Sequence, residues 1–225
     1  MTSNIQPPNW LEKTGAALKR WLTGNKAELE NLRRDQHGLI QSFDAIIEAW
    51  ALSLETSKHA GEGHIRRVTD MTVAMARRMG IAEADIVHVR RGALLHDIGE
   101  MNVPDAILLK VDPLLPAERA ILRRHPAYAY EMLSGIELLR PALDIPYCHH
   151  ENWDGKGYPR GLKGEEIPFA ARIFAGVDTY DAVRIDRPYR KAWAERQTWE
   201  YLSSQSGLLF DPSVVAAFVE AYKKQ

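Results

Sequence analysis

The chain has 225 residues, of which 45% are hydrophobic and 26% are charged, and its formal net charge is −1. This length can bury one sizeable core, and the near-neutral charge argues against a nucleic-acid polymer or a membrane surface as the main partner. The first eight residues lack the basic start and apolar core of a secretory signal, and no apolar run reaches membrane-spanning length. The single cysteine, Cys148, excludes an intrachain disulfide, so we expect a cytoplasmic location.

The first 55 residues differ in pattern from the rest of the chain. Residues 1–25 contain Pro7 and Pro8 followed by a short amphipathic piece, which we interpret as a frayed helix or a linker remnant. Across residues 26–55, apolar side chains recur at alternating steps of three and four, with Gln36 on the same stripe. That spacing fits a two-helix seam as well as one helix laid on a core. A homodimer through this helix and intramolecular packing therefore both stay open.

The remaining residues, 56–225, are expected to form one helical domain. Glycines near residues 61–63 break the first helix, and later helices are predicted from apolar spacing and from glycine and proline positions. We expect helices at residues 64–79, 83–97, 117–124, 127–134, 137–150 (bent or delayed by prolines), 167–183 and 212–222. Strand alternation and internal repeats are both missing from the sequence. The predicted fold class is all-α, with an N-terminal helical extension.

Two stretches carry the chemistry. In residues 149–164, two adjacent histidines precede a segment with four glycines, a proline and two aromatic residues. That composition predicts a glycine-hinged loop beside a metal-binding pair. In residues 93–100, an apolar run ends in His96 and Asp97. Neighbouring residues do not share a helix face, but at a helix end both side chains can converge on one cation.

Other potential ligands lie at helix ends or in helices that face the same core. His64 follows glycines at a predicted first turn, and Asp178 lies in an apolar helix, where an unpaired buried carboxylate is costly unless it binds a cation. His37, His59 and His88 are expected to be ordinary surface or core residues. The candidate metal ligands are His64, His96, Asp97, His125, His149, His150 and Asp178.

These ligands predict a class of reaction. Imidazole and carboxylate without thiolate suit iron, manganese or zinc, and six or seven such groups are too many for one ion. Two metals bridged by a carboxylate can clamp a phosphate's oxygens and lower the pKa of a water for in-line attack on phosphorus. The expected reaction is phosphodiester or phosphomonoester hydrolysis.

Four ordered motifs together resemble a known family. They are Leu95-His96-Asp97-Ile98-Gly99, His125-Pro126, His149-His150-Glu151 and Gly155-Lys156-Gly157-Tyr158-Pro159. The chain is similar to the HD-GYP domain, a branch of the HD metal-dependent phosphohydrolases that degrades cyclic di-GMP. The match extends from about Gly63 to the end of the chain.

The resemblance implies an HD fold with a binuclear or trinuclear centre of iron or manganese, zinc being less favoured. It implies the seven ligands given above, with Asp97 bridging. We take His96, Asp97 and Glu100 as the candidate catalytic residues. It also implies that Tyr158, Gly157 and Lys156 line the substrate pocket. Arg187 and Arg190 would face guanine or phosphate groups, tasks that suit a guanidinium fork.

The sequence departs from the family pattern at two positions. Where family members often carry a Glu that supports a third metal, this chain has Ala60, and Glu62 would point elsewhere, so we predict a binuclear site. Where the family usually has Lys after His-Asp-Ile-Gly, this chain has Glu100. An anion in place of a cation near a phosphate removes stabilisation and adds repulsion, so activity could be lowered, abolished or retargeted.

Three hypotheses follow. The first is a cyclic di-GMP phosphodiesterase of bacterial second-messenger signalling that opens the ring to linear pGpG and continues to GMP. The second is a weakly active or inactive regulatory module that binds a cyclic dinucleotide and signals to a protein partner through residues 26–55. The third is a phosphohydrolase that acts on another cyclic dinucleotide or on an ordinary nucleotide.

Overall fold

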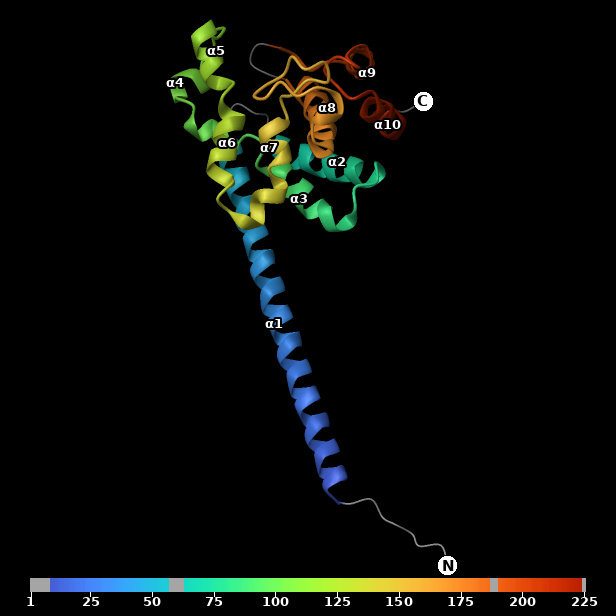
Figure 1. The fold of residues 1–225 in the computed structure, drawn as a ribbon. Helices are drawn as coiled ribbons and strands as arrows, with labels where there is room; N and C mark the ends of the chain where they lie inside the picture. The colour runs from blue at the N-terminus through green and yellow to red at the C-terminus, as the bar shows by residue number, and fades with distance from the viewer. Residues whose placement is uncertain (1–8, 57–62, 187–189, 224–225) are drawn as a thin grey trace, which may run out of the picture. The chain divides into compact units, whose positions relative to one another are not determined.

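The computed structural model describes residues 9–56, 63–186 and 190–223, which are mostly helical (Figure 1). These residues form no β-strand, and Ser206 and Phe210 make an isolated bridge. The predicted all-α class is confirmed. The α-helices are α1 (Asn9–Thr56), α2 (His64–Arg78), α3 (Glu83–Leu94), α4 (Asp105–Leu108), α5 (Pro116–Leu122), α6 (His125–Leu133), α7 (Asp144–Cys148), α8 (Phe169–Val183), α9 (Glu195–Ser204) and α10 (Pro212–Tyr222). The 3₁₀ helices are η1 (Ile98–Asn102), η2 (Glu137–Ala142) and η3 (Gly164–Glu166).

The chain divides into two compact units, Met1–Ile46 and Ile47–Gln225. The boundary between the units lies within α1, and a domain boundary between residues 55 and 56 stays a prediction. Helix α1 begins at Asn9, directly after Pro8, and continues without a break past Lys26. The short piece expected in residues 1–25 is therefore the start of one long helix, because no proline lies within residues 9–56 to stop it.

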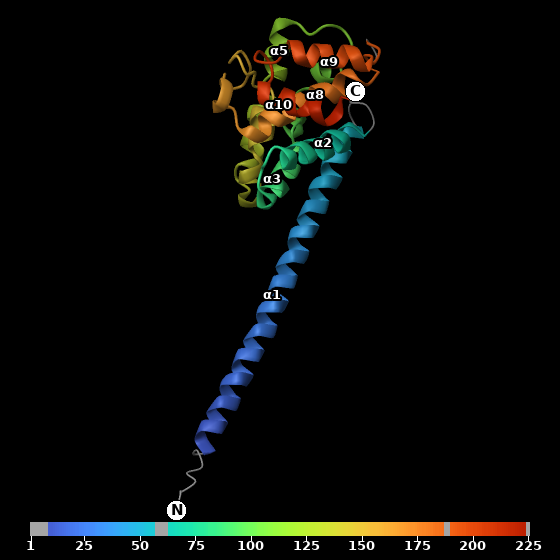
Figure 2. The same ribbon diagram turned by 90° about the vertical axis from the view of Figure 1, so that its right-hand side faces the viewer.

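The core of the second unit lies between α2, α3, α8, α9 and α10. Its buried side chains include Val68, Met75, Phe174, Trp199 and Phe218. Figures 1 and 2 show α2 and α3 as neighbours, and α2 packs on both α3 and α8. This apolar packing holds α2 against α8. It thereby places His64 of α2 beside Asp178 and Asp181 of α8.

Several predicted helices end earlier or break where polar motif residues occur. Helix α3 ends at Leu94 rather than near Asp97, and residues 95–97 form a turn in which the Leu95 N–H donates to the carbonyls of Arg91 and Gly92. The helix predicted at residues 137–150 is divided into η2 and α7, with Pro141, which lacks an N–H donor, inside η2. As a result, the two histidine motifs lie in turns rather than on helix faces.

Candidate metal centre

Helix ends position the histidines. His64 and His125 are the first residues of α2 and α6, and His149 and His150 form the turn that directly follows α7. His96 lies in the turn after α3. A terminal residue can turn its side chain along the helix axis, so chain segments far apart in sequence can bring their imidazoles to one place.

Four of the histidines are held through Nδ1. Three Nδ1 atoms lie 2.9, 2.9 and 3.1 Å from backbone carbonyl oxygens, namely His96 on Ala93, His125 on Leu122 and His149 on Ile145. The Nδ1 atom of His64 lies 2.7 Å from Oδ2 of Asp181. Because a carbonyl oxygen accepts only from N–H, the three backbone contacts place a proton on Nδ1 and leave Nε2 as an available ligand atom.

The Nε2 atoms converge on Asp97. The Nε2 of His96 lies 3.3 Å from Asp97 Oδ2, and the Nε2 atoms of His125 and His149 lie 3.5 and 3.6 Å from Asp97 Oδ1. The Nε2 atoms of His125 and His149 are themselves 3.2 Å apart. With their protons on Nδ1, these two nitrogens face one another with lone pairs only. A divalent cation fits such a donor set.

The potential ligands form two groups, each with ligand atoms within 4.8 Å of one another. One group is His125, His149 and His150, and the other is His64, His96 and Asp178. Asp97 contacts members of both groups through its two carboxylate oxygens. The structure therefore brings together all seven residues that the sequence singled out as candidate ligands.

The centre opens to solvent on the side of its carboxylates. The side chains of His96, His125 and His149 are 3%, 2% and 1% exposed, whereas those of Asp97 and Asp178 remain 32% and 26% exposed. These three imidazoles are buried, so a molecule from solvent would reach the carboxylates first.

Burial and neighbouring carboxylates set the protonation of the histidines. Burial lowers the pKa of His125 to about 4 and holds that of His150 well below its usual value, so both are neutral near pH 7. Burial also opposes protonation of His64, but hydrogen bonds to Asp178 and Asp181 raise its pKa to about 10. His64 is therefore protonated in the metal-free protein, and a metal ion must displace that proton to bind this imidazole.

A glycine in the His-Asp motif permits a close approach. A Cβ on Gly99 would lie 1.9 Å from the carbonyl oxygen of His125, because η1 packs directly on the start of α6. Any larger residue would push these two segments apart. Gly99 therefore brings His96 and Asp97 within reach of His125.

The glycine loop folds back on the second histidine motif. The buried carboxylate of Glu151 accepts from the N–H groups of Arg160 and Leu162 at 2.7 and 3.0 Å, and the Tyr158 N–H donates to the His150 carbonyl at 3.1 Å. A Cβ on Gly157 would lie 2.3 Å from the Asn152 nitrogen, so only glycine fits that position.

This loop places Tyr158 beside the histidines. The ring of Tyr158 stacks on His150, with centroids 4.7 Å apart and an interplanar angle of 26°. Burial, opposed by Arg123 and reinforced by Asp97 and Glu100, holds the pKa of the Tyr158 hydroxyl above its usual value. The hydroxyl therefore stays protonated at neutral pH and can donate a hydrogen bond.

Comparisons with known proteins give the family of the chain. A family model described as HD domain matches residues 50–214. The chain belongs to the HD-domain family. Phosphohydrolases of this family are metal-dependent, and the two side-chain groups of this HD domain fit that requirement.

Curated relatives match this chain over about three quarters of its length. A cyclic di-GMP phosphodiesterase response regulator from Xanthomonas campestris is 37% identical over 171 residues, and a cyclic di-GMP phosphodiesterase from Thermotoga maritima is 38% identical over 163 residues. The alignments cover 75% and 72% of this chain and 45% and 44% of those relatives, so the chain spans less than half of their length. The resemblance to the HD-GYP branch is confirmed.

Solved structures share the fold. A cyclic GMP-AMP specific phosphodiesterase from Vibrio cholerae has a TM-score of 0.58 at 17% identity, covering 79% of this chain and 49% of that chain. An HD-GYP-type protein from Bdellovibrio bacteriovorus has a TM-score of 0.57 at 19% identity, covering 72% and 52%. In the described part of the HD domain and of α1, no helix has the length and apolarity needed to cross a membrane.

The other residues predicted for the site have varied positions in the HD domain. Lys156 is exposed, and its ammonium lies 2.8 Å from Asp154. Arg190 donates to the carbonyls of Ala182 and Val183 at the end of α8, at 2.8 and 2.9 Å. Glu100 lies half-buried on η1, close enough to Tyr158 to affect its pKa. Arg187, Ala60 and Glu62 lie outside the described residues.

Sequence reasoning missed the role of Asp181. Its side chain is 8% exposed, accepts from Arg67 Nε at 2.7 Å and contacts His64 Nδ1. The signal was available, because Asp181 follows Asp178 by three residues and shares its face of an apolar helix. Arg123 was also missed. Its guanidinium carbon lies 4.4 Å from the Tyr158 ring centroid, a contact between segments with no shared periodicity.

Proposed function

We propose that this HD-domain chain is a metal-dependent phosphodiesterase that hydrolyses cyclic di-GMP to linear pGpG and further to GMP. The observation that carries the proposal is the set of imidazoles whose Nδ1 atoms bind the protein while their Nε2 atoms converge on Asp97. Relatives named as cyclic di-GMP phosphodiesterases support the choice of substrate. The chain spans less than half of the length of those relatives. The activity of this chain is therefore a proposal and is not taken over from theirs.

The proposed centre holds two ions of iron or manganese, with zinc less favoured. His125, His149 and His150 would hold one ion, and His64, His96 and Asp178 would hold the other, with Asp97 shared between them. Two bound cations supply charge that clamps phosphate oxygens and lowers the pKa of a water. Imidazole and carboxylate donors suit iron and manganese similarly, so availability decides between these metals.

The chain's own residues would orient the substrate. Carbonyls hold His96, His125 and His149 in fixed rotations, which reduces the reorganisation needed when the phosphate binds. The protonated hydroxyl of Tyr158 is a hydrogen-bond donor for a substrate oxygen. Gly157 lets its loop approach the histidines, and Lys156, Arg187 and Arg190 are the further candidates for phosphate or guanine contacts.

A second candidate function is a binding module with little turnover. Glu100 favours it, because its carboxylate lies near Tyr158 and would repel a phosphate there. Such a module would transmit nucleotide occupancy to a signalling protein partner. A different cyclic dinucleotide is a further alternative, since a relative from Vibrio cholerae, 34% identical over 192 residues, is named a 3′3′-cGAMP-specific phosphodiesterase; the alignment covers 84% of this chain and 35% of that relative.

We also propose a homodimer formed through residues 26–55. Leu29, Leu32 and Leu39 are 54%, 59% and 73% exposed, and they lie on one stripe at steps of three and seven. A repeated apolar stripe of this kind is typical of a two-helix seam. The cytoplasmic location expected from the sequence stays a prediction.

The test is anaerobic hydrolysis of cyclic di-GMP by protein loaded with iron or manganese, with products separated by chromatography. We expect pGpG to form first and GMP to follow, and we expect His96→Ala to abolish the activity, while His37→Ala, on the exposed surface of α1, leaves it unchanged. A panel that includes 3′3′-cGAMP separates the substrate alternatives. Full metal loading with nucleotide binding but no turnover would favour the regulatory module.

A further inference from the structure

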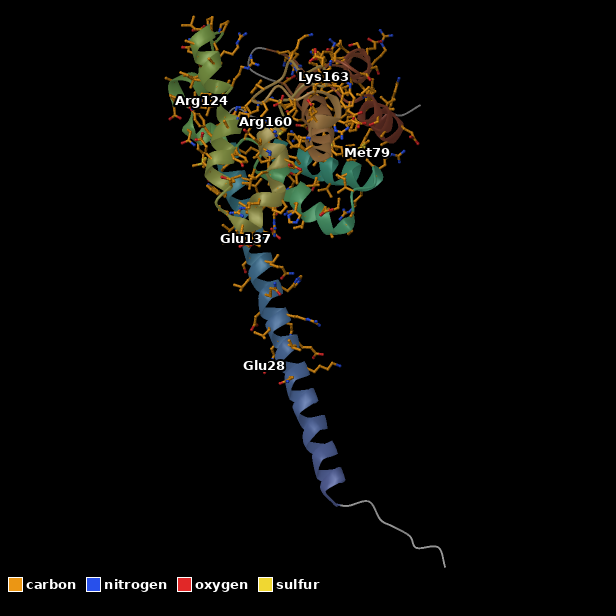
Figure 3. The ribbon with its side chains drawn as sticks, viewed as in Figure 1. Glu28, Met79, Arg124, Glu137, Arg160 and Lys163 are labelled. Carbon is orange, nitrogen blue, oxygen red and sulfur yellow. The ribbon has the colours of Figure 1, made fainter. Side chains whose placement is uncertain are left out.

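A cavity of about 550 Å³ adjoins the tyrosine of the glycine loop. We call it the arginine cavity, because Arg119, Arg123 and Arg124 line it together with Tyr158 and Pro159. Its arginines come from α5 and from the turn that joins α5 to α6, where Figure 3 labels Arg124. The volume lies within the range that small-molecule sites occupy.

The arginines that line this cavity are positively charged at neutral pH. Among the residues that the structure describes, none of the three arginines has an ion-pair partner. The acidic residue of α5, Glu118, is paired with Lys110 at 2.6 Å and also accepts from the Leu115 N–H. Three arginines that line one cavity therefore favour an anionic occupant.

Tyr158 lines the arginine cavity and also contacts the metal centre. The guanidinium of Arg123 lies over the Tyr158 ring, 4.4 Å from its centroid, and the same ring stacks on His150. His150 in turn lies 5.0 Å from His125, centroid to centroid. One tyrosine therefore separates the basic hollow from one of the two ligand groups.

Substrate size connects these observations. A cyclic dinucleotide carries two phosphates and two bases, and only one phosphate can lie on the metals at a time. The other phosphate, with its nucleoside, needs a separate site within the reach of one molecule. A guanidinium held against an aromatic ring is suited to that task, because stacking fixes it while its N–H groups bind phosphate oxygens.

We infer that the arginine cavity binds the half of the dinucleotide that is not being cut, with Arg123 as the specificity-determining residue. This inference rests on the proposed function, whose substrate it places. Arg123 would also supply a positive charge near the metal centre, in a chain that has Glu100 where the family usually has Lys. The cavity selects substrates with a second negative group over those with a single phosphodiester.

The experiment compares two substrates on the manganese-loaded full chain. Bis(p-nitrophenyl) phosphate has one phosphodiester and reports on the metal centre alone, whereas cyclic di-GMP also reports on the cavity. For Arg123→Ala we expect kcat/KM on cyclic di-GMP to fall by about 10- to 100-fold, mainly through KM, as for loss of a charge-assisted hydrogen bond. Hydrolysis of bis(p-nitrophenyl) phosphate should stay within about twofold, and Arg123→Lys should recover part of the loss.

Arg140→Ala is the matched control. Arg140 lines a second cavity, of about 570 Å³, that does not include Tyr158. Its replacement should leave both substrates unaffected. Equal kinetics of Arg123→Ala and the unmodified chain on cyclic di-GMP would overturn the inference, and so would an equal loss on both substrates.

Failure of the proposed function gives a different result. If the unmodified chain hydrolyses neither substrate, calorimetric titration with cyclic di-GMP takes the place of kinetics. Binding at least about tenfold weaker in Arg123→Ala than in Arg140→Ala would still support the cavity. Equal affinities would overturn it.

Discussion

His64 is held by a carboxylate, whereas three other histidines of the centre are held by backbone carbonyls. Asp181 makes that contact and is fixed in turn by two hydrogen bonds from Arg67, at 2.7 and 3.0 Å. A carboxylate on the far nitrogen orients the imidazole and raises its basicity as a ligand. Asp181 therefore orients the candidate ligand His64 and is not itself a candidate metal ligand.

Replacing Asp181 tests this positioning. In Asp181→Asn we expect metal affinity to fall by about 10- to 100-fold, because the charge that orients His64 and pairs with Arg67 is lost. Competition with a chromogenic chelator measures the affinity. Asp70→Asn, on the exposed face of the helix that begins at His64, is the control and should bind metal normally. Unchanged affinity in Asp181→Asn would assign Asp181 a role in packing only.

Glu100 is the second residue whose charge bears on the centre. Glu100→Lys places a cation where the carboxylate now acts on Tyr158, so we expect cyclic di-GMP turnover to rise by about tenfold or more. Steady-state kinetics on metal-loaded protein measure it. Glu137→Lys, on the exposed start of η2, controls for net charge. Equal or lower turnover in Glu100→Lys would mean that the native site uses or tolerates the carboxylate.

At the scale of elements, the sequence predicted which helices exist better than where they end. The apolar spacing in residues 83–94 identified α3, but hydrophobic periodicity does not reveal that Leu95 turns back on Arg91 and Gly92. The adjacency of His96 and Asp97 was the better guide, since it predicted convergence at a helix end. The contact between Arg123 and Tyr158 was beyond prediction, because it arises only when α5 and the glycine loop meet.

The packing of η1 on α6 is the element-scale contact on which the centre depends. In Gly99→Ala the new methyl would overlap the His125 carbonyl, so we expect about 1–3 kcal/mol of lost stability together with weaker metal binding. Urea unfolding and metal titration measure the two effects. Gly135→Ala, where a Cβ meets nothing within 4 Å, is the control and should change neither. Normal metal binding in Gly99→Ala would show that the two segments can move apart without harm.

At the scale of the whole molecule, α1 is divided between the two compact units. Only its last part, with Ile47 and Ala51 buried, belongs to the second compact unit. The first unit carries the exposed leucine stripe. The seam was predicted from spacing alone, and one sequence does not distinguish a partner helix from an intramolecular one, because both bury the same stripe.

Charge on the stripe tests the homodimer. We expect the full chain to be dimeric by light scattering, and we expect Leu39→Glu to make it monomeric, because two carboxylates would face one another across the seam. Gln41→Glu adds the same charge at an exposed position away from the stripe and should remain dimeric. A monomeric unmodified chain, or a dimer that survives Leu39→Glu, would contradict the proposed seam.

The most direct test of the two-metal centre is anomalous diffraction from crystals grown with manganese or, without oxygen, with iron. We expect two anomalous peaks per chain, one at His125, His149 and His150 and one at His64, His96 and Asp178, with Asp97 between them. A single peak, or peaks remote from Asp97, would contradict the account, however active the protein proved in solution.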